Sequence, residues 1–272
     1  MSSSFLKALC VATLGLWPAL CAARDLRVCS EPHNLPFSNM AGEGFENRIA
    51  QLVADDLKAY LVNVWQIQRR AFVRNGLGAK VCDLVIGMPK SMTTVRTTRP
   101  YYRSRFVLLT RAADPAVDGL ADPALQHMRI GVQMSGDDGG GTPPSYMLTN
   151  LGLANRLHGY PLYDDYTAEN RPARIVEALA SGEIDAAAVW GPLAGYYAPR
   201  AATPLRLLPL QGPAAGPMQM AFDIAMAVRK DDEALAQEID NVIARRQGDI
   251  DAILRAYGVP LQTPEQRDGA QP

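Results

Sequence analysis

The chain has 272 residues, which is enough for two modest lobes or one large domain, and either arrangement can bury a core. Its 27 basic and 28 acidic side chains nearly cancel, and no basic run is interleaved with aromatic residues, which argues against nucleic acid as the main partner. The sequence also shows no cationic patch suited to a membrane surface.

The N-terminus has the pattern of an export signal. Lys7 precedes an apolar run over residues 8–20, and the small residues Ala22 and Ala23 follow, so we expect cleavage after Ala23 and a periplasmic mature chain. The run is too short to span a bilayer, and no later apolar segment is long enough to do so. A lipoprotein anchored through Cys21 is the alternative, although Leu20 is bulkier than such sites prefer.

Two cysteines, Cys29 and Cys82, remain after the signal peptide, residues 1–23, is removed. In an oxidising compartment such a pair often forms a disulfide bond. If their two strands are parallel neighbours, however, the cysteines lie at opposite strand ends, roughly 10 Å or more apart. A Cys29 to Cys82 disulfide and two buried free thiols both remain open.

Apolar spacing predicts alternating strands and helices along the mature chain. The first half is expected to contain strands at 26–29, 60–65 and 84–87, helices at 45–58 and 72–78, and a long β-rich stretch at 101–110. A Pro, Asp and Gly-rich break at 114–123 precedes a second series. That series comprises strands at 129–134, 162–163, 184–190, 205–210 and 221–228, and helices at 145–153, 173–180, 231–246 and 249–257.

This order predicts an α/β protein with a parallel sheet in each of two lobes. Residues 24–110 form the first part of lobe 1, residues 111–217 form lobe 2, and residues 218–258 return to lobe 1, followed by a disordered tail at 259–272. Two extended crossover segments, near 105–110 and 221–228, make a hinged clamshell with a cleft. Periplasmic solute-binding proteins of type II have this architecture.

Several sequence blocks also resemble one subgroup of that superfamily. They are 34–39 (NLPFSN), 42–47 (GEGFEN), 100–104 (PYYRS), 136–139 (GDDG), 189–196 (VWGPLAGY) and 222–226 (FDIAM). In this order and spacing they resemble the periplasmic binding-protein-like accessory proteins of PQQ-dependent methanol and alcohol dehydrogenase systems, the XoxJ/MxaJ type. The matching blocks extend over nearly the whole mature chain.

The resemblance implies a periplasmic accessory protein that has no catalytic residues and no cofactor of its own. Its implied partner is a PQQ-dependent alcohol dehydrogenase, in some systems a lanthanide-dependent one, with the cytochrome c of that system as a further candidate. It would assist activation or maturation of the dehydrogenase by direct contact. A receptor that delivers a small molecule to an ABC importer is the alternative.

The expected cleft lies where loops follow the carboxyl ends of strands. Amino-acid receptors of the fold implied by the resemblance hold the ligand ammonium with an acid at the end of a strand of lobe 2, but here that place reads Val189-Trp190-Gly191. Without the acid, an ordinary amino acid is a poor ligand. Arg96 is a candidate for gripping an anion, and a solvated basic face is its alternative.

The candidate cleft or partner-binding residues come mainly from the loop after the first strand and from the segments expected to face it. They are Glu31, Asn34, Pro36, Phe37, Asn39, Arg69, Arg96, Tyr101, Tyr102, Asp137, Asp138 and Trp190. Core packing is the alternative for Trp190 and the two tyrosines, and a solvated turn is the alternative for the two aspartates. We expect no metal site, because no ligand spacing of a known type occurs. The sequence likewise lacks a nucleophile elbow, a phosphate loop or a catalytic carboxylate pair.

Overall fold

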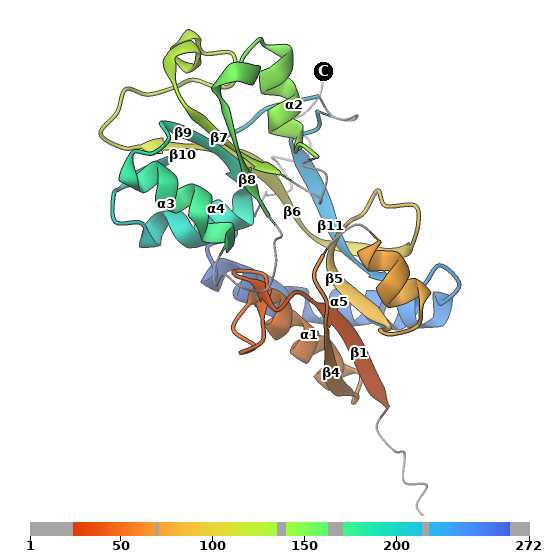
Figure 1. Ribbon diagram of the computed structural model, residues 1–272. Coiled ribbons are helices and arrows are strands. Elements are labelled where there is room, and N and C mark those ends of the chain that lie inside the picture. Colours follow the sequence, from red (N-terminus) through yellow and green to blue (C-terminus); the bar gives the residue numbers. More distant parts are fainter. Residues whose placement is uncertain (1–23, 69–70, 135–139, 163–170, 214–217, 262–272) are drawn as a thin grey trace, which may run out of the picture.

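The computed structural model describes residues 24–68, 71–134, 140–162, 171–213 and 218–261, so the expected signal peptide and residues 262–272 lie outside the described residues. Two halves with separate hydrophobic cores are joined by two long strands (Figure 1). We call residues 24–105 and 221–261 lobe 1, and residues 106–213 and 218–220 lobe 2.

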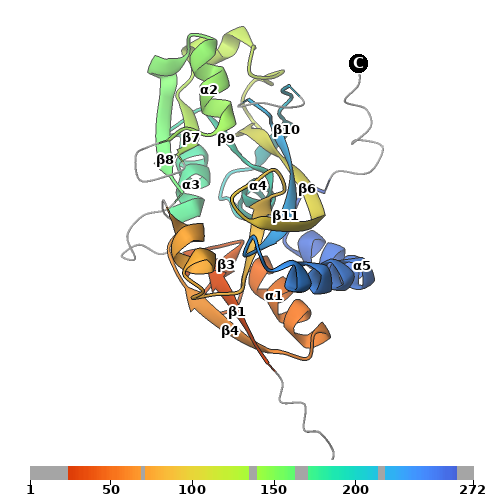
Figure 2. The same cartoon turned by 90° about the vertical axis from the view of Figure 1, so that its right-hand side faces the viewer.

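Lobe 1 is built around strand β1, which pairs in parallel with β4 on one side and β5 on the other. Helices α1 and α5 lie side by side against one face, where Ile49, Val53, Ile239 and Ile243 are fully buried (Figure 2). Its elements are β1 (Asp25–Ser30), β2 (His33–Asn34), β3 (Ser38–Asn39), α1 (Phe45–Asp56), β4 (Tyr60–Trp65), the π-helical turn η1 (Arg74–Gly78), β5 (Leu84–Pro89) and α5 (Glu233–Ala256).

Lobe 2 repeats the parallel pattern, with β7 between β8 and β9. Helix α3 ends at Gly182, whose φ of 81° is the left-handed conformation that glycine adopts without strain. The elements are η2 (Pro123–His127), β7 (Ile130–Met134), α2 (Pro143–Asn150), η3 (Ala154–Arg156), β8 (Leu157–Pro161), η4 (Arg171–Ala173), α3 (Arg174–Ser181), β9 (Ala186–Trp190), α4 (Gly191–Tyr197), η5 (Ala198–Arg200) and β10 (Leu205–Pro209).

The two long strands are β6 (Arg96–Arg111) and β11 (Ala221–Val228), and they connect the lobes through one sheet. In the described residues this sheet has nine strands, eight of which follow the order β4-β1-β5-β11-β6-β9-β7-β8, while the ninth, β10, pairs with β6. Strand β6 pairs with β11 up to Arg105, and from Phe106 onward it pairs with β9. The chain therefore crosses between the lobes near residue 105, and residues 106–110 belong to lobe 2.

Several predicted elements need correction. The short strand expected at 162–163 is instead β8, five residues earlier, and the helix expected at 72–78 is largely π-helical. Gly248 does not separate two helices, because buried Ile243, Ile250 and Leu254 hold α5 as one helix through it. Helix α4 was not expected; it begins at Gly191-Pro192, and proline suits the first turn of a helix. Val259 is 4% exposed in the core of lobe 1, so the packed chain extends beyond the expected limit at residue 258.

The same three-residue anchor stabilises both lobes. In lobe 1, Nε and Nη2 of Arg27 donate to the Asp83 carboxylate at 2.9 and 2.7 Å, and Arg229 from the end of β11 adds a third contact at 3.2 Å. In lobe 2, Nε and Nη2 of Arg129 donate to Asp185 at 3.0 and 2.8 Å, and Arg111 approaches the same carboxylate to 3.3 Å. The anchor of lobe 1 thus connects β1, the start of β5 and the end of β11. The anchor of lobe 2 connects the starts of β7 and β9 and the end of β6 in the same way.

Asp185→Asn is expected to lower the free energy of unfolding by about 2 kcal/mol at pH 7. Hydrogen bonds from Arg129 are the main reason that the pKa of Asp185 falls from 3.8 to about 2. The stabilisation is present above pH 3.8 and is lost as the pH falls through about 2. Urea unfolding at pH 7 and pH 3 measures both effects. Asp249→Asn removes the same charge from an exposed i,i+3 pair and should change stability by less than about 0.5 kcal/mol; equal losses in the two variants would contradict the prediction.

Candidate functional site

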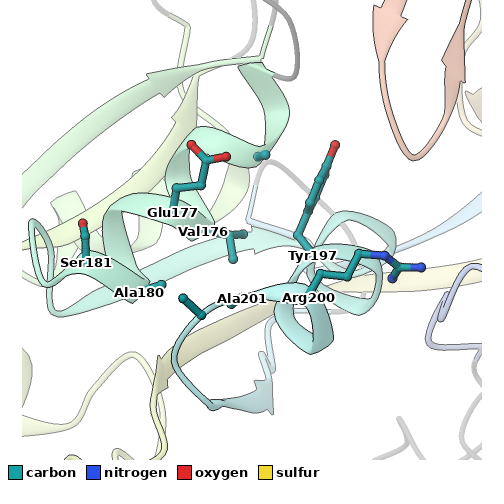
Figure 3. A pocket seen from close by; sticks show the side chains of 9 residues that line it. Val176, Glu177, Ala180, Ser181, Tyr197, Arg200 and Ala201 are labelled. Carbon is teal, nitrogen blue, oxygen red and sulfur yellow. The ribbon is translucent and has the colours of Figure 1, made fainter.

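A cavity of about 530 Å³ lies between the two lobes. Lobe 1 contributes side chains from the loop after β1, the first turn of α1, and strands β5, β6 and β11, and lobe 2 contributes the ends of β7 and β9 and the start of α2. The volume is in the range of small-molecule sites. Another hollow, of about 290 Å³, lies within lobe 2 between α3 and α4 (Figure 3). It is lined by small side chains and by three larger ones that carry polar groups, Glu177, Tyr197 and Arg200.

We call the cavity of about 530 Å³ between the lobes the cleft. Aromatic rings form much of its wall. Trp190, at the end of β9, packs edge to face with Phe106 and Phe222, with ring centroids 5.1 and 6.0 Å away. The Trp190 side chain also packs against the hydrophobic cores of both lobes, and Tyr102 belongs to that of lobe 1. Trp190 thus links the two lobes at the cleft.

Gln133 supplies a polar group at the carboxyl end of β7. Its side chain is 1% exposed, and its Oε1 accepts a hydrogen bond from the backbone N–H of Trp190 at 2.7 Å. This bond fixes the orientation of the amide, because only the oxygen can accept. The remaining Nε2 group is buried and has no hydrogen-bond partner among the described residues. An unpaired buried donor is costly, so a ligand with an acceptor oxygen would be favoured here.

Glu46 places a carboxyl group in the cleft wall. It lies in the first turn of α1, and its Oε1 would be 2.0 Å from a Cβ added at Gly87. Gly87 has a φ of 80° and lines the same cavity, so glycine is required at this point of β5 both for its conformation and for the space. Burial raises the pKa of Glu46 to about 8.

Glu46→Gln is expected to raise the free energy of unfolding at pH 9 by on the order of 2 kcal/mol and to leave it nearly unchanged at pH 4. Because the folded pKa of Glu46, about 8, exceeds its ordinary value of 4.5, the folded chain loses stability relative to the unfolded chain as the pH rises between these values. Because the Glu46 side chain is only partly buried, we expect a smaller gain in the free energy of unfolding than the full change in its pKa would give. Thermal unfolding from pH 4 to 9 tests this. Exposed Glu43→Gln is the control, and a parallel pH profile for both variants would refute the assignment.

Four of the candidate residues line the cleft: Asn34, Phe37, Tyr102 and Trp190. They come from the loop after β1, from the middle of β6 and from the end of β9. Arg69, Asp137 and Asp138 lie outside the described residues. The positions expected from the loop after β1 and the end of β9 therefore meet across one cavity.

The other candidates do not line the cleft. Arg96 lies at the far end of β6, where it donates to the Lys230 carbonyl and pairs with Glu233, so it cannot grip an anion in the cavity. Tyr101 does not line the cavity: the pairing of β6 with β11 shifts at this residue, and its ring packs in the core of lobe 1 against that of Tyr102, with centroids 4.9 Å apart and 2% of Tyr101 exposed. The remaining three have structural contacts in the loop. Glu31 accepts from the Gln68 backbone N–H, Asn39 bonds to Glu43 and Asn47, and the carbonyl of Pro36 accepts from the N–H of Phe45.

The sequence analysis missed Glu46, Gln133, Phe106 and Phe222. Gln133 lies near the carboxyl end of the parallel strand β7, which is where ligands bind in such sheets. The predicted strand at 129–134 was therefore a sufficient signal for it. Glu46 gave no separate signal, because an acid in the first turn of a helix is common for helix-dipole reasons alone.

The fold and the interlobe cavity define a two-lobed binding protein. The chain belongs to the bacterial extracellular solute-binding proteins, family 3, whose model matches residues 26–260. Among the described helices, none is both long and apolar enough to cross a membrane.

More specific similarity is to proteins named MoxJ. The MoxJ protein of Methylorubrum extorquens (strain AM1) is 36% identical over 255 residues, covering 88% of this chain and 82% of that protein. The MoxJ protein of Paracoccus denitrificans is 29% identical, with 90% and 91% covered. The crystal structure of periplasmic binding protein XoxJ from Methylobacterium extorquens AM1 matches with a TM-score of 0.71 and 38% identity, covering 88% of this chain and 99% of that one.

The crystal structure of MxaJ from Methlophaga aminisulfidivorans MPT matches with a TM-score of 0.74 and 27% identity, covering 87% of this chain and all of that one. An ancestral cationic amino acid binding protein matches at 18% identity with a TM-score of 0.65, which shows the shared fold alone. The resemblance to the XoxJ/MxaJ type and the periplasmic binding-protein fold are thus confirmed.

Proposed function

We propose that this protein is a periplasmic, non-enzymatic accessory of a PQQ-dependent methanol or alcohol dehydrogenase, including the lanthanide-dependent class, and that it assists activation or maturation of that enzyme by direct binding. The observation that carries the proposal is similarity to MoxJ and XoxJ over nearly the whole mature chain, at 36% and 38% identity. Homology to these proteins supports a binding-protein-like role in a methanol dehydrogenase system.

The described part of the cleft also supports a role other than amino-acid uptake. No arginine or lysine is found among the described residues that line it, so a ligand carboxylate lacks the cationic partner that it would need. Trp190 stands where the acid for a ligand ammonium was expected at the end of β9.

The test is deletion of this gene in its host, with growth on methanol and dehydrogenase activity as the measurements. We expect the dehydrogenase polypeptide to be exported in normal amount but to have low specific activity, and the mature chain to restore activity and to co-elute with the dehydrogenase in size-exclusion chromatography. The expected periplasmic location is checked by fractionation and by the N-terminal residue of the purified chain, which should be Arg24.

An importer receptor is the second candidate, favoured by the size of the cleft and by the unpaired Nε2 of Gln133. Normal dehydrogenase activity in the deletion strain, together with lost uptake of a solute, would reject the accessory role in favour of this one.

A further inference from the structure

Glu46 is an acid that faces the cleft and has no counter-charge among the residues that the structure describes. No hydrogen bond or ion pair from a described residue reaches its carboxyl group, and burial is the cause of its raised pKa. The titratable groups facing it are the phenols of Tyr101 and Tyr102 from β6, and β5 offers only Gly87 at this point. The described parts of the neighbouring elements thus present no cation to Glu46, although its carboxyl group lies at a cavity of about 530 Å³.

The surroundings of this carboxyl group suit a cation with an organic body. Phe37, Tyr102, Trp190 and Phe222 line the same cavity, and aromatic faces attract cations while they bury apolar groups. The Nε2 group of Gln133, which is buried and unpaired, can donate to an oxygen of such a ligand. A ligand carboxylate, by contrast, would meet the acid Glu46 and no basic side chain among the described lining residues.

We propose that the cleft binds an alkyl or arylalkyl ammonium ion that carries an acceptor oxygen and no carboxylate, with its charge on Glu46 and its apolar part between Phe37 and Trp190. This ligand class differs from amino acids by the missing carboxylate. The proposal goes beyond the accessory role and does not depend on it, because the binding partner here is a small cation and the readout requires no dehydrogenase.

Binding is coupled to ionisation of Glu46. The empty site has a raised pKa of about 8, and the ammonium favours the carboxylate, so binding near neutral pH releases a proton. If only the ionised form binds, the affinity should rise about 50-fold between pH 6 and pH 8. The ammonium itself remains charged over this range, since amines of this kind titrate near pH 10.

The experiment is titration calorimetry of the mature chain at pH 8 with three matched probes. Tyramine carries the ammonium, tyrosol replaces the ammonium with a hydroxyl, and tyrosine adds a carboxylate. We expect saturable tyramine binding with a change in tryptophan fluorescence, binding of tyrosol at least tenfold weaker, and no binding of tyrosine. No saturable tyramine binding up to 10 mM, or tyrosine binding as tightly as tyramine, would overturn the proposal.

Glu46→Gln should remove the preference for tyramine over tyrosol, whereas exposed Glu43→Gln should preserve it. Unchanged tyramine affinity in folded Glu46→Gln would place the cation elsewhere and refute the assignment. If Glu46→Gln does not fold, the wild-type chain still decides, because titration in buffers of different ionisation enthalpy counts the released protons. Release of no proton at pH 7 would also count against Glu46. These binding measurements do not involve the dehydrogenase, and the deletion-strain test does not involve tyramine. Either proposal can therefore be refuted while the other stands.

Discussion

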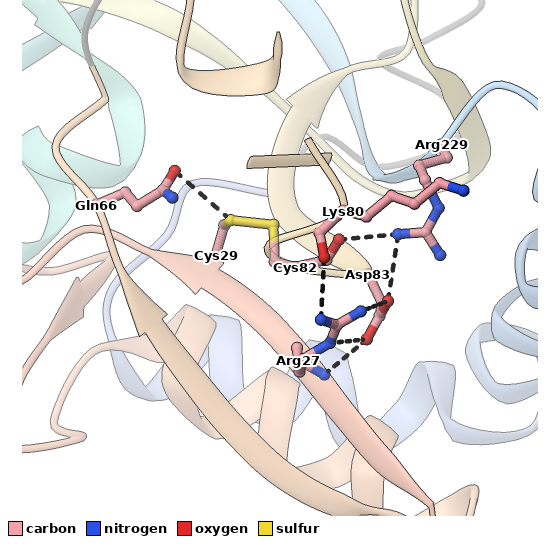
Figure 4. The surroundings of a disulfide bond; sticks show 7 residues. All are labelled: Arg27, Cys29, Gln66, Lys80, Cys82, Asp83 and Arg229. Atoms are coloured by element: carbon pink, nitrogen blue, oxygen red, sulfur yellow. Dashed lines mark hydrogen bonds and ion pairs between the residues drawn. A yellow bond between two sulfur atoms is a disulfide. The ribbon is translucent and has the colours of Figure 1, made fainter. Parts of the chain in front are cut away.

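Replacing Cys29 and Cys82 together by alanine is expected to lower the free energy of unfolding by about 4 kcal/mol. The structure joins the two residues in a disulfide bond, with Cα atoms 5.6 Å apart and a sequence separation of 53 (Figure 4). The closed loop contains α1, β4 and η1, which are a large part of lobe 1. Opening a loop of this length returns conformational entropy to the unfolded chain, which is the main source of the expected loss.

Packing around the sulfur atoms adds to that loss. Cys29 and Cys82 are 3% and 0% exposed, and a Cβ added at Gly76 would be 2.7 Å from Sγ of Cys29. Urea unfolding of the variant and of the native chain, with and without reductant, measures the effect. Reductant should lower the midpoint of the native chain toward that of the variant and leave the variant unchanged. Equal midpoints for the oxidised chain and the variant would show that the bond contributes nothing.

The disulfide shows where sequence reasoning about distance was insufficient. Treating the two strands as parallel neighbours put the cysteines roughly 10 Å or more apart. In the structure β1 and β5 pair only at Val28 and Cys29, and Cys29 stands opposite Val85. Cys82 precedes β5 in the turn after η1, where the backbone does not follow the strand direction. Strand order was predictable from the alternation of elements, but register and turn path depend on tertiary contacts.

The cleft was predictable in place but only partly in composition. The rule for carboxyl ends of strands pointed to the loop after β1 and to Trp190, and residues of both line the cavity, since local sequence determines where strands end. Phe106 and Phe222 were missed because each lies in a long strand, and which of its residues meet at the crossing depends on the pairing of β6 with β11 and β9. Arg96 was expected at the cleft, but it is the first residue of β6, about fifteen residues before the end of this strand in lobe 2. Its position thus also depends on how the long strand pairs.

Gly195→Ala is expected to destabilise the protein by about 3 kcal/mol. Gly195 lies in α4 of lobe 2, and its added Cβ would be 1.9 Å from the carbonyl oxygen of Gly258, which follows α5 in lobe 1. Gly258 has a φ of 70°, a left-handed conformation, so its backbone cannot readily move to another position. Because the contact joins the backbone of Gly195 to the backbone of Gly258, no side chain can move aside. Helix α4 and the C-terminal segment must therefore separate to admit a methyl group.

Gly248→Ala is the matched control, because both substitutions reduce the freedom of the unfolded chain equally. Gly248 is exposed within α5 and its added Cβ meets nothing within 4 Å, so this variant should gain about 0.5–1 kcal/mol. Comparison of the two urea midpoints therefore isolates the close contact. A Gly195→Ala variant as stable as Gly248→Ala would mean that the lobes do not meet here.

The contact at Gly195 also bears on the cleft. Beside it the rings of Tyr196 and Tyr257 stack with centroids 5.9 Å apart, and Tyr197 donates to the carbonyl of Leu35 at 3.0 Å. Helix α4 thus contacts the C-terminal segment and the loop after β1, and this loop carries Asn34 and Phe37 into the cleft. Separation of α4 from lobe 1 should therefore alter the cleft as well as stability, and Gly195→Ala should weaken tyramine binding while Gly248→Ala preserves it.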